Sequence, residues 1–386
     1  MPKTIAITPS WYWPAGISRV VGVPPYSIYE LCLVRNERRE PGAVALADQH
    51  GQLTFAELRA EVARRAGSLA LAAGETRLAA LPGELSRENV LELLAGLAAG
   101  ARLRVVPRGA DASSFAAASG ASVVAGREPA GSTDAIPNPA LLDPKRPSVT
   151  IDGETAPVNH TDRSLLAMAI SMSTFVDADR HAPWLSILPL SSWEGLMAVI
   201  LPLFLGAPLV LPAAGSDPDA LLGLISRHQV RFAAADLPSF AYACREAKRA
   251  AKDARRTLTA ALLAVDGPFD PDQRRRVSKA LECPALTFWG MPETGPVFAA
   301  HQSWYIDESI GLPMTNAHVV PSDPRSGQPI QALWELVEMA EVTVFSPSLM
   351  AGYEGVDAAP RFAGNRFRTG MMASSDANGM IYLLGR

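Results

Sequence analysis

The chain has 386 residues and a mass of 41.0 kDa, long enough to bury a large hydrophobic core. Its content of 48% hydrophobic and 19% charged residues is typical of a globular protein and excludes a disordered one. The formal net charge of -4 does not supply the basic face that nucleic-acid binding usually needs, so we expect no nucleic-acid partner.

The three cysteines, Cys32, Cys244 and Cys283, lie far apart in the sequence. Their spacing matches neither a metal site nor a disulfide framework. The first residues contain no apolar run of the kind found in a secretory leader. These features predict a cytoplasmic protein with no metal-ligand cluster.

In the first third of the chain, Thr54 and Glu57 have the spacing of a capping box and predict the start of a helix that ends near Gly74. The predicted elements that follow are a helix over 87–99 and short strands over 103–106 and 121–125.

The uncharged stretch 195–215 allows two interpretations. Its length approaches the ~20 residues of a membrane span. However, Pro202, Gly206 and Pro208 interrupt it, and such residues leave backbone groups without partners in lipid. We therefore predict a buried helix, a turn and a short buried strand over 208–211, and no membrane span.

Asp217-Pro218 and Asp270-Pro271 each place a capping residue before a first-turn proline, which predicts helices over 218–228 and 271–281. The basic run 274–276 is expected on the solvated face of the second helix. Apolar runs at 261–265 and 285–288 predict parallel strands on either side of it. Beyond Gly311, strands are predicted over 334–337, 342–345 and 380–384.

The stretch Phe288-Trp289-Gly290-Met291-Pro292-Glu293-Thr294-Gly295 carries the most informative motif. It resembles the Tyr-Gly-Met-Thr-Glu-Thr signature of the adenylate-forming enzymes, the family of acyl-CoA synthetases, luciferases and peptide-synthetase adenylation domains. In that family, the glutamate and threonines face ATP. The glutamate is present as Glu293, but Pro292 replaces the first threonine and offers a phosphate neither a hydroxyl nor an N–H.

Shorter segments extend the resemblance over nearly the whole chain. The opening 11–17 and the helix start 53–58 are similar to bacterial long-chain fatty-acid–CoA ligases. Further similar segments, in the order of the family, are 188–195, 202–206, 311–313, 350–353 and 368–370. The aromatic cluster 11–13 is then expected to belong to an N-terminal arm packed on the large domain.

The resemblance implies an α/β fold: the large domain of an adenylate-forming enzyme, with two doubly wound α/β subdomains and a distorted β-barrel. We expect the tandem subdomains with their arm over 1–310 and the β-rich barrel region over 311–386. Gly385-Arg386 is similar to the dipeptide that precedes the hinge of the family. The small C-terminal domain, with its carboxylate-binding lysine, is therefore expected to be absent.

The resemblance also implies site residues. Glu293 is the catalytic candidate, holding magnesium and ATP; the alternative is a capping or ion-pairing role beside the strand end. The implied nucleotide contacts are Gly267, Trp289, Gly290, Met291 and Thr294, with Trp289 in place of the tyrosine that stacks on adenine. The implied acyl pocket is Ser192, Trp193 and Gly195, where Trp193 is expected to form a core or pocket wall.

Three departures from the family lie in nucleotide motifs. The glycine-rich phosphate loop ending in Pro-Lys-Gly corresponds here to 151–157, which holds one glycine, no lysine and two carboxylates. Met371 replaces the aspartate that holds the ribose hydroxyls, and a methionine cannot accept those bonds. Asp266 replaces the first glycine of the adenine turn. His160, after the shortened loop, is expected to face solvent at a helix start.

By resemblance, the chain is an AMP-forming acyl-CoA synthetase of the fatty-acid–CoA ligase type, which activates a carboxylic acid with ATP and magnesium and passes it to CoA. Since losing one preorganised contact costs about two to three orders of magnitude in rate, its activity is expected to be weak or lost. The alternative is a non-catalytic pseudoenzyme that binds an acyl group, a nucleotide or a partner. A third hypothesis is that a separate polypeptide supplies the C-terminal domain.

Overall fold

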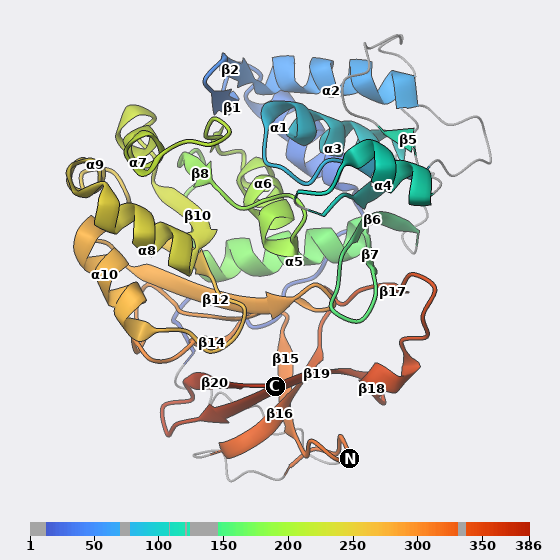
Figure 1. Cartoon of the computed structure of the whole chain (residues 1–386), viewed down its shortest axis with the longest axis vertical. Coiled ribbons are helices and arrows are strands. Elements are labelled where there is room, and N and C mark those ends of the chain that lie inside the picture. Colours follow the sequence, from blue (N-terminus) through green and yellow to red (C-terminus); the bar gives the residue numbers. More distant parts are fainter. Residues whose placement is uncertain (1–12, 70–77, 108, 120–121, 124–145, 331–336) are drawn as a thin grey trace.

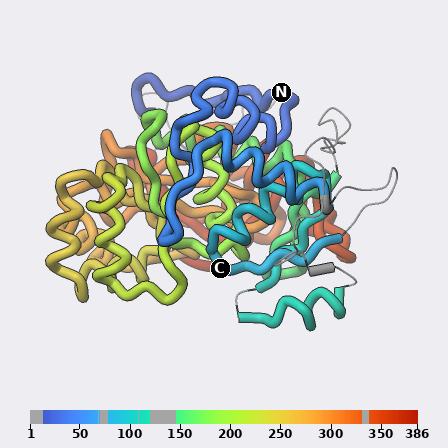
Figure 2. The backbone as a smooth tube through the Cα atoms, turned by 90° about the horizontal axis from the view of Figure 1, so that it is seen from above, coloured from blue at the N-terminus to red at the C-terminus, as the bar shows by residue number. Residues whose placement is uncertain are grey.

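The computed structural model describes residues 13–69, 78–107, 109–119, 122–123, 146–330 and 337–386, and within these its strands form three sheets. In Figure 1 two α/β layers lie above a β-rich region made by the last part of the chain. Seen from above in Figure 2, the helices of residues 218–254 and the helix of residues 112–119 lie at opposite ends of the molecule. This arrangement confirms the predicted large-domain fold of an adenylate-forming enzyme.

The nine-stranded sheet is parallel in its centre and antiparallel at both edges. In spatial order, its strands are β14 (Leu312–Pro313), β13 (Gly295–Ala299), β12 (Ala285–Met291), β11 (Ala260–Ala264), β10 (Phe232–Asp236), β8 (Trp184–Ser186), β9 (Leu209–Val210), β1 (Val44–Asp48) and β2 (Gly51–Thr54). Every residue of β11 and β12 is buried, as expected for strands covered on both faces.

The six-stranded sheet is also parallel in its centre, and the β-rich region is antiparallel. The six-stranded sheet has the order β17 (Gly352–Tyr353), β7 (Val158–Thr161), β6 (Pro147–Ile151), β4 (Arg102–Val105), β3 (Leu78–Leu81) and β5 (Ser122–Val123). The β-rich sheet contains β15 (His318–Ser322), β16 (Val337–Phe345), β19 (Arg366–Ser375), β18 (Phe362–Ala363) and β20 (Ile381–Gly385). The proposed division at residue 310 stays a prediction.

Several of the helices begin at residues whose side chains cap them. Thr54 and Glu57 form the predicted reciprocal cap, with the Thr54 N–H donating to Glu57 over 2.8 Å. Asp217 and Asp270 cap their helices through their side chains. The helices are α1 (Arg35–Arg39), α2 (Phe55–Leu69), α3 (Arg87–Ala99), α4 (Ala112–Ser119), α5 (Asp162–Val176), α6 (Trp193–Leu205), α7 (Pro218–Arg227), α8 (Leu237–Glu246), α9 (Lys248–Ala254) and α10 (Pro271–Leu281), with a π-helical turn at Glu30–Val34 and a 3-10 turn at Ala359–Arg361.

The apolar stretch 195–215 folds as the predicted buried helix, turn and strand, α6 and β9. Gly206 closes the helix with a φ of 77°, a backbone conformation that favours glycine. Across the described residues, no helix is both long and apolar enough to cross a membrane. The cysteines Cys32, Cys244 and Cys283 are buried free thiols.

One strand predicted in the β-rich region is longer than expected, and some predictions lie outside the described residues. The strand predicted over 342–345 is the end of β16, which begins at Val337 and has register shifts between Val337 and Ala340 and between Glu341 and Thr343. Outside the described residues lie Trp11, Tyr12, the helix end at Gly74, residues 334–336 and all of the strand predicted over 121–125 except β5.

Arg274 is fully buried, which corrects the prediction of a solvated basic face on α10; Arg275 and Arg276 are exposed. The Arg274 Nε donates to the Ala285 carbonyl over 2.8 Å, and Nη1 donates to the Ser309 carbonyl over 2.9 Å. Burial lowers the pKa of this guanidinium to about 10. It therefore joins α10 to β12 and to the segment after β13.

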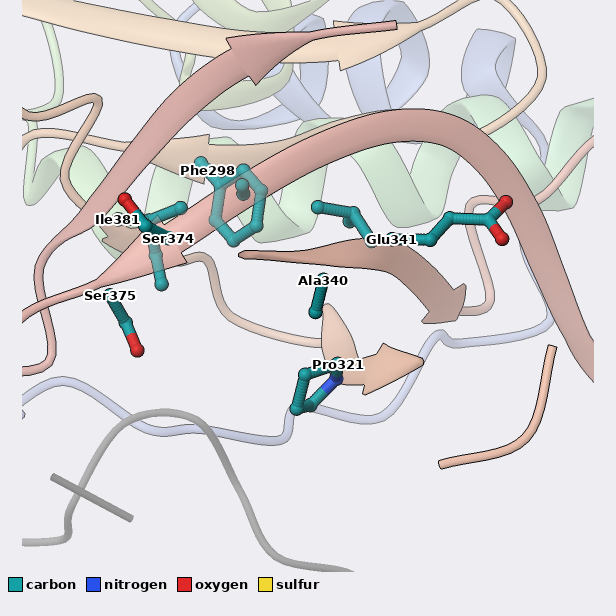
Figure 3. Close-up of a pocket in the computed structure, with 9 residues that line it drawn as sticks. Phe298, Pro321, Ala340, Glu341, Ser374, Ser375 and Ile381 are labelled. Carbon is teal, nitrogen blue, oxygen red and sulfur yellow. The ribbon is translucent and has the colours of Figure 1, made fainter. Parts of the chain in front are cut away.

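A small cavity of about 10 Å³ marks where the nine-stranded sheet meets the β-rich sheet. Figure 3 shows Phe298 of β13 pointing toward Ile381 of β20, with Ala340 of β16 close by. A space of this size holds at most about one water molecule. The two sheets are thus packed against each other and leave no ligand site between them at this point.

Candidate nucleotide and acyl site

The end of β12 and the turn that joins it to β13 hold most of the predicted nucleotide residues. Met291 pairs with Gly295 across this tight hairpin. A Cβ on Gly290 would lie 2.0 Å from the Gly295 carbonyl oxygen and 2.9 Å from the Trp193 ring. Only glycine permits this approach. The hairpin itself therefore requires glycine at position 290. The same glycine lies against the predicted acyl-pocket residue Trp193.

Thr294 and Met291 are enclosed by the same turn. The Thr294 side chain is 0% exposed; its Oγ1 accepts from the Met291 N–H over 3.1 Å and donates to the Gly295 carbonyl over 2.9 Å. Both capacities of this hydroxyl are used within the hairpin. Met291 is also buried. The structure thus gives both residues roles in the turn.

Trp289 lies inside the core, although the resemblance places a base-stacking ring at this position. Its ring is 1% exposed and stacks on Phe298 with centroids 5.7 Å apart. Phe298 belongs to β13, the antiparallel neighbour of β12. In this arrangement the indole fills the space between neighbouring strands.

Glu293 is 1% exposed, and its two carboxylate oxygens have different surroundings. Oε1 accepts from the Tyr353 hydroxyl over 2.9 Å, whereas Oε2 has no hydrogen-bond partner in the described part of the chain. A Cβ on Gly153 would lie 3.6 Å from Oε1. Burial, together with the charge and hydrogen bond of Glu293, raises the pKa of Tyr353 to about 12. Glu293 is thus covered by the turn between β6 and β7 and by β17.

The two carboxylates of that turn bind basic side chains of this chain. Asp152 lies 3.8 Å from an Arg104 guanidinium nitrogen, and Glu154 pairs with Arg386. Arg104 also pairs with Glu354, which accepts from Arg102 over 2.6 Å. The turn that replaces the phosphate loop of the family is therefore held in place by ion pairs to Arg104 of β4 and to Arg386, and Arg104 is also paired with the residue after β17.

His160 is fully buried on β7, which corrects the prediction that it faces solvent. Its Nε2 lies 2.7 Å from the Pro292 carbonyl and must donate, since a carbonyl only accepts; Nδ1 lies 3.1 Å from Ser164 Oγ. Burial lowers the pKa of His160 to about 4. The ring therefore ties β7 to the β12–β13 turn as a neutral group, across a sequence separation of 132 residues.

The predicted acyl-pocket residues form the start of α6. Ser192 caps the helix, because its Oγ accepts from the Gly195 N–H over 3.1 Å. A Cβ on Gly195 would lie 1.8 Å from the Pro189 carbonyl oxygen. Trp193 is 1% exposed and meets Phe288 edge to face at 5.8 Å. The ring is thus buried between α6 and β12.

Glu194 is a residue of this region that the sequence did not single out. It is half-buried in the first turn of α6. Burial raises the pKa of its carboxyl to about 7, and the charge of Asp266, in the loop after β11, acts in the same direction. The sequence held a signal for this residue, because Glu194 is the one charged residue in the helix Trp193–Leu205.

Gly267, in the loop after β11, adopts a φ of 154°, and a Cβ there would lie 3.6 Å from the terminal methyl group of Met371. Met371 is 1% exposed. The neighbouring Thr369 hydroxyl donates to the Val342 carbonyl over 2.7 Å and accepts from the Met371 N–H over 3.0 Å. Where the ribose would lie, the predicted site thus has the thioether of Met371 and the hydroxyl of Thr369. That hydroxyl is already hydrogen-bonded within the β-rich sheet.

These residues do not fit a nucleoside triphosphate and its magnesium ion. The turn 152–157 presents two carboxylates and no lysine where phosphates would need donors. Glu293 is sealed beneath it, and the hydroxyl of Thr294 is already used. The unpartnered Oε2 of Glu293 has the chemistry of a metal ligand, but the cover over it would have to open first.

The family is decided by a match over residues 152–354, more than half of the chain, to the model described as AMP-binding enzyme. The chain belongs to the AMP-binding enzyme family. No curated protein matches it. The matched residues run from the shortened turn to the ion-pair residue Glu354. They therefore include all of the predicted catalytic, nucleotide and acyl-pocket residues.

Solved structures of adenylate-forming enzymes share the fold of this AMP-binding family member. ATP-bound MatB from Rhodopseudomonas palustris has 18% identity and a TM-score of 0.79, over 93% of this chain and 78% of that one. Unliganded O-succinylbenzoate coenzyme A synthetase (MenE) from Bacillus subtilis has 20% identity and a TM-score of 0.76, over 92% and 78%. The AMPPNP-bound form of the nonribosomal peptide synthetase FmoA3 has 20% identity and a TM-score of 0.82, over 97% and 44%. Identities this low support the fold and not the substrate.

Proposed function

We propose that this AMP-binding family member is an acyl-CoA-synthetase-like protein of the fatty-acid–CoA ligase type, with weak or lost ATP-dependent activity of its own. One observation carries the proposal: Glu293, the catalytic candidate, is sealed under the turn 152–157 and bonded to Tyr353. Adenylation depends mainly on positioning and on charge neutralisation at the phosphates. Because the turn 152–157 closes the part of the site where the phosphates would bind, the reaction lacks both the positioning and the charge neutralisation.

The residues beside α6 support a different part of the proposal, which is that a carboxylic acid binds there. Trp193 and Phe288 form an apolar wall there, and Gly290 keeps the strand close to it. With a pKa of about 7, the Glu194 carboxyl is about half protonated at neutral pH and so repels an acid less than an ordinary glutamate would. Binding of magnesium by Glu293 and of ATP by the nucleotide residues would require the turn 152–157 to open first.

Acid-dependent exchange of pyrophosphate into ATP tests the enzyme proposal directly, with calorimetric titration of Mg–ATP and of a non-hydrolysable acyl-adenylate analogue on the same sample. We expect no measurable exchange and no micromolar ATP binding. The Met371→Asp variant, which restores the ribose acceptor, should by itself leave exchange undetectable because the turn 152–157 still covers Glu293. Rapid exchange by the unmodified chain would overturn the proposal.

The alternative is a non-catalytic module that binds an acyl group, a nucleotide or a partner protein. Binding of the acyl-adenylate analogue without exchange would favour this module. Exchange that appears only when a family C-terminal domain is added as a separate polypeptide would favour complementation instead. CoA-dependent thioester formation belongs to the same assay and is expected only in the complemented mixture.

A further inference from the structure

A pocket of about 480 Å³ is lined by none of the residues of the α6 site. It is formed by the N-terminal arm, the first turn of α5, the segment from β14 to β15, and the end of β16. The lining residues are Trp13, Arg19, Val20, Val21, Val23, Arg163, Pro313, Met314, Asn316, Ala317, His318, Val319, Phe345 and Pro347. Its volume is within the range of about 300–1,000 Å³ typical of small-molecule sites.

The wall made by the arm is held by hydrogen bonds from the β14–β15 segment. The Asn316 side chain accepts from the Val21 N–H over 2.8 Å and donates to the Val21 carbonyl over 3.0 Å. The Thr315 hydroxyl donates to the Ser18 carbonyl over 2.8 Å. An arm fixed at two points gives a pocket that is formed before any ligand arrives, which lowers the entropy cost of binding.

The lining combines apolar side chains with arginines. Val20 is 79% exposed and Phe345 47% exposed, so apolar surface is available at this pocket. Arg163 is exposed and, in the described part of the chain, forms no ion pair; the Arg19 guanidinium lies 4.9 Å from the Trp13 ring centre. None of the lining residues is an aspartate or a glutamate. The pocket is therefore apolar with a purely positive charge.

We propose that this pocket binds the anionic form of a fatty acid, with the carboxylate at Arg19 and Arg163 and the alkyl chain along the arm. Charge complementarity selects an acid over an alcohol or an amine of the same length. The apolar lining selects a long tail over a small anion. This site is independent of the proposed adenylation function and would persist if that function failed.

Photo-crosslinking locates the ligand. The full chain is irradiated with dodecanoate carrying a diazirine on its tail, below micelle-forming concentrations, and the labelled peptides are identified by mass spectrometry. We expect labels within 13–23 and 313–319. Labels confined to 188–197 and 288–297 would assign the acid to the α6 site alone and overturn the second site. Labels in both regions would support two separate sites.

Substitutions at the exposed edge of the pocket test the charge argument without touching the core. Val20→Asp and Arg163→Gln should each reduce labelling at 313–319 about fivefold, as expected for an exposed ion pair. The matched controls Val356→Asp and Arg249→Gln, at exposed positions outside the pocket, should leave it unchanged. Dodecanol should not compete with the probe, whereas unlabelled dodecanoate should.

Three further outcomes would contradict the proposal. Labelling that rises only after residues 1–12 are deleted would make the start of this chain the occupant of the pocket. Labelling that falls with protein concentration, together with dimerisation seen by analytical ultracentrifugation, would make a second copy the occupant. Equal labelling by Val20→Asp, Arg163→Gln and the unmodified chain would show that the arginines do not hold the carboxylate.

Discussion

Glu293 and Pro292 occupy neighbouring positions in one turn, and each is held by a residue from another part of the chain. Tyr353 of β17 donates to Glu293, and His160 of β7 donates to the Pro292 carbonyl. Both partners belong to the six-stranded sheet, whereas the turn belongs to the nine-stranded one. At the scale of single residues, the family motif here serves to join two sheets.

The Tyr353→Phe variant tests that junction. It removes the one hydrogen bond that the buried Glu293 carboxylate accepts in the described part of the chain, which should lower the free energy of unfolding by about 2–3 kcal/mol. Urea denaturation followed by circular dichroism measures it. Tyr242→Phe, at a 53% exposed ring, is the control and should be neutral. Equal midpoints for the two variants would show that Glu293 is not held by this bond.

His160 predicts a pH dependence of stability. Its pKa is about 4 in the folded protein and near 6.5 when exposed, so the unfolded chain takes up the proton first. The contribution of the neutral ring is present above about pH 6.5 and is lost as the pH falls toward 4, by roughly 3 kcal/mol.

The measurement is the difference in unfolding free energy between the unmodified chain and His160→Gln, at pH 7 and at pH 4.5. This difference should shrink at the lower pH. The comparison between variants is needed because the raised pKa of Glu194, about 7, gives stability that increases as the pH falls toward 4.5. A difference that is constant with pH would place the His160 ring in water.

At the scale of elements, helix starts and strand ends depend on close backbone approaches. The first turn of α6 lies against the Pro189 carbonyl, and β12 lies against the Gly295 carbonyl. Glycine at 195 and 290 makes both contacts sterically feasible. The Ser192 cap and the Trp193–Phe288 contact then fix the helix on the sheet.

The pair Gly195→Ala and Gly223→Ala tests this point, because both glycines are helical. At 195 the new methyl group would lie 1.8 Å from the Pro189 oxygen and should cost about 3 kcal/mol or more. At 223, in α7, no atom of the described residues lies within 4 Å, and alanine should stabilise the helix by up to about 1 kcal/mol. Thermal unfolding measures both, and a tolerated Gly195→Ala would mean that α6 can shift.

At the scale of the whole molecule, charged side chains cross between layers. Glu354 connects the segment after β17 to Arg102 and Arg104 of β4. Arg274 connects α10 to β12 and to the segment after β13 through backbone carbonyls. Such contacts explain why the last part of the chain, including β17, is built into the α/β layers.

Arg274→Lys should lower the free energy of unfolding by about 2–4 kcal/mol, since a single ammonium cannot satisfy carbonyls in several directions and remains buried. The matched control is Arg276→Lys, two residues further along the same helix and exposed, which should be neutral. Guanidinium denaturation compares them at equal ionic strength. Similar midpoints would contradict the structural role of the buried arginine.

The sequence by itself determined the elements whose signals are local. The reciprocal cap at Thr54 and Glu57 and the Asp-Pro starts of α7 and α10 involve residues within a few positions of each other, and the short-range geometry of a helix decides them. The family motif at 288–295 was equally visible, as was the loss of the lysine and glycines at 151–157. The apolar run of α6 was separable from a membrane span because its prolines and glycine punctuate it.

Only the tertiary structure decided what the polar residues of the site do. Glu293 meets its partner Tyr353 at a separation of 60 residues, and His160 meets Pro292 at 132. Arg274 looked solvated because its carbonyl partners are backbone atoms with no sequence signature. The pocket of about 480 Å³ likewise combines residues 13–23 of the N-terminal arm with residues 313–347. Burial and long-range hydrogen bonding are properties of the packed layers, and no local pattern encodes which side chain will face them.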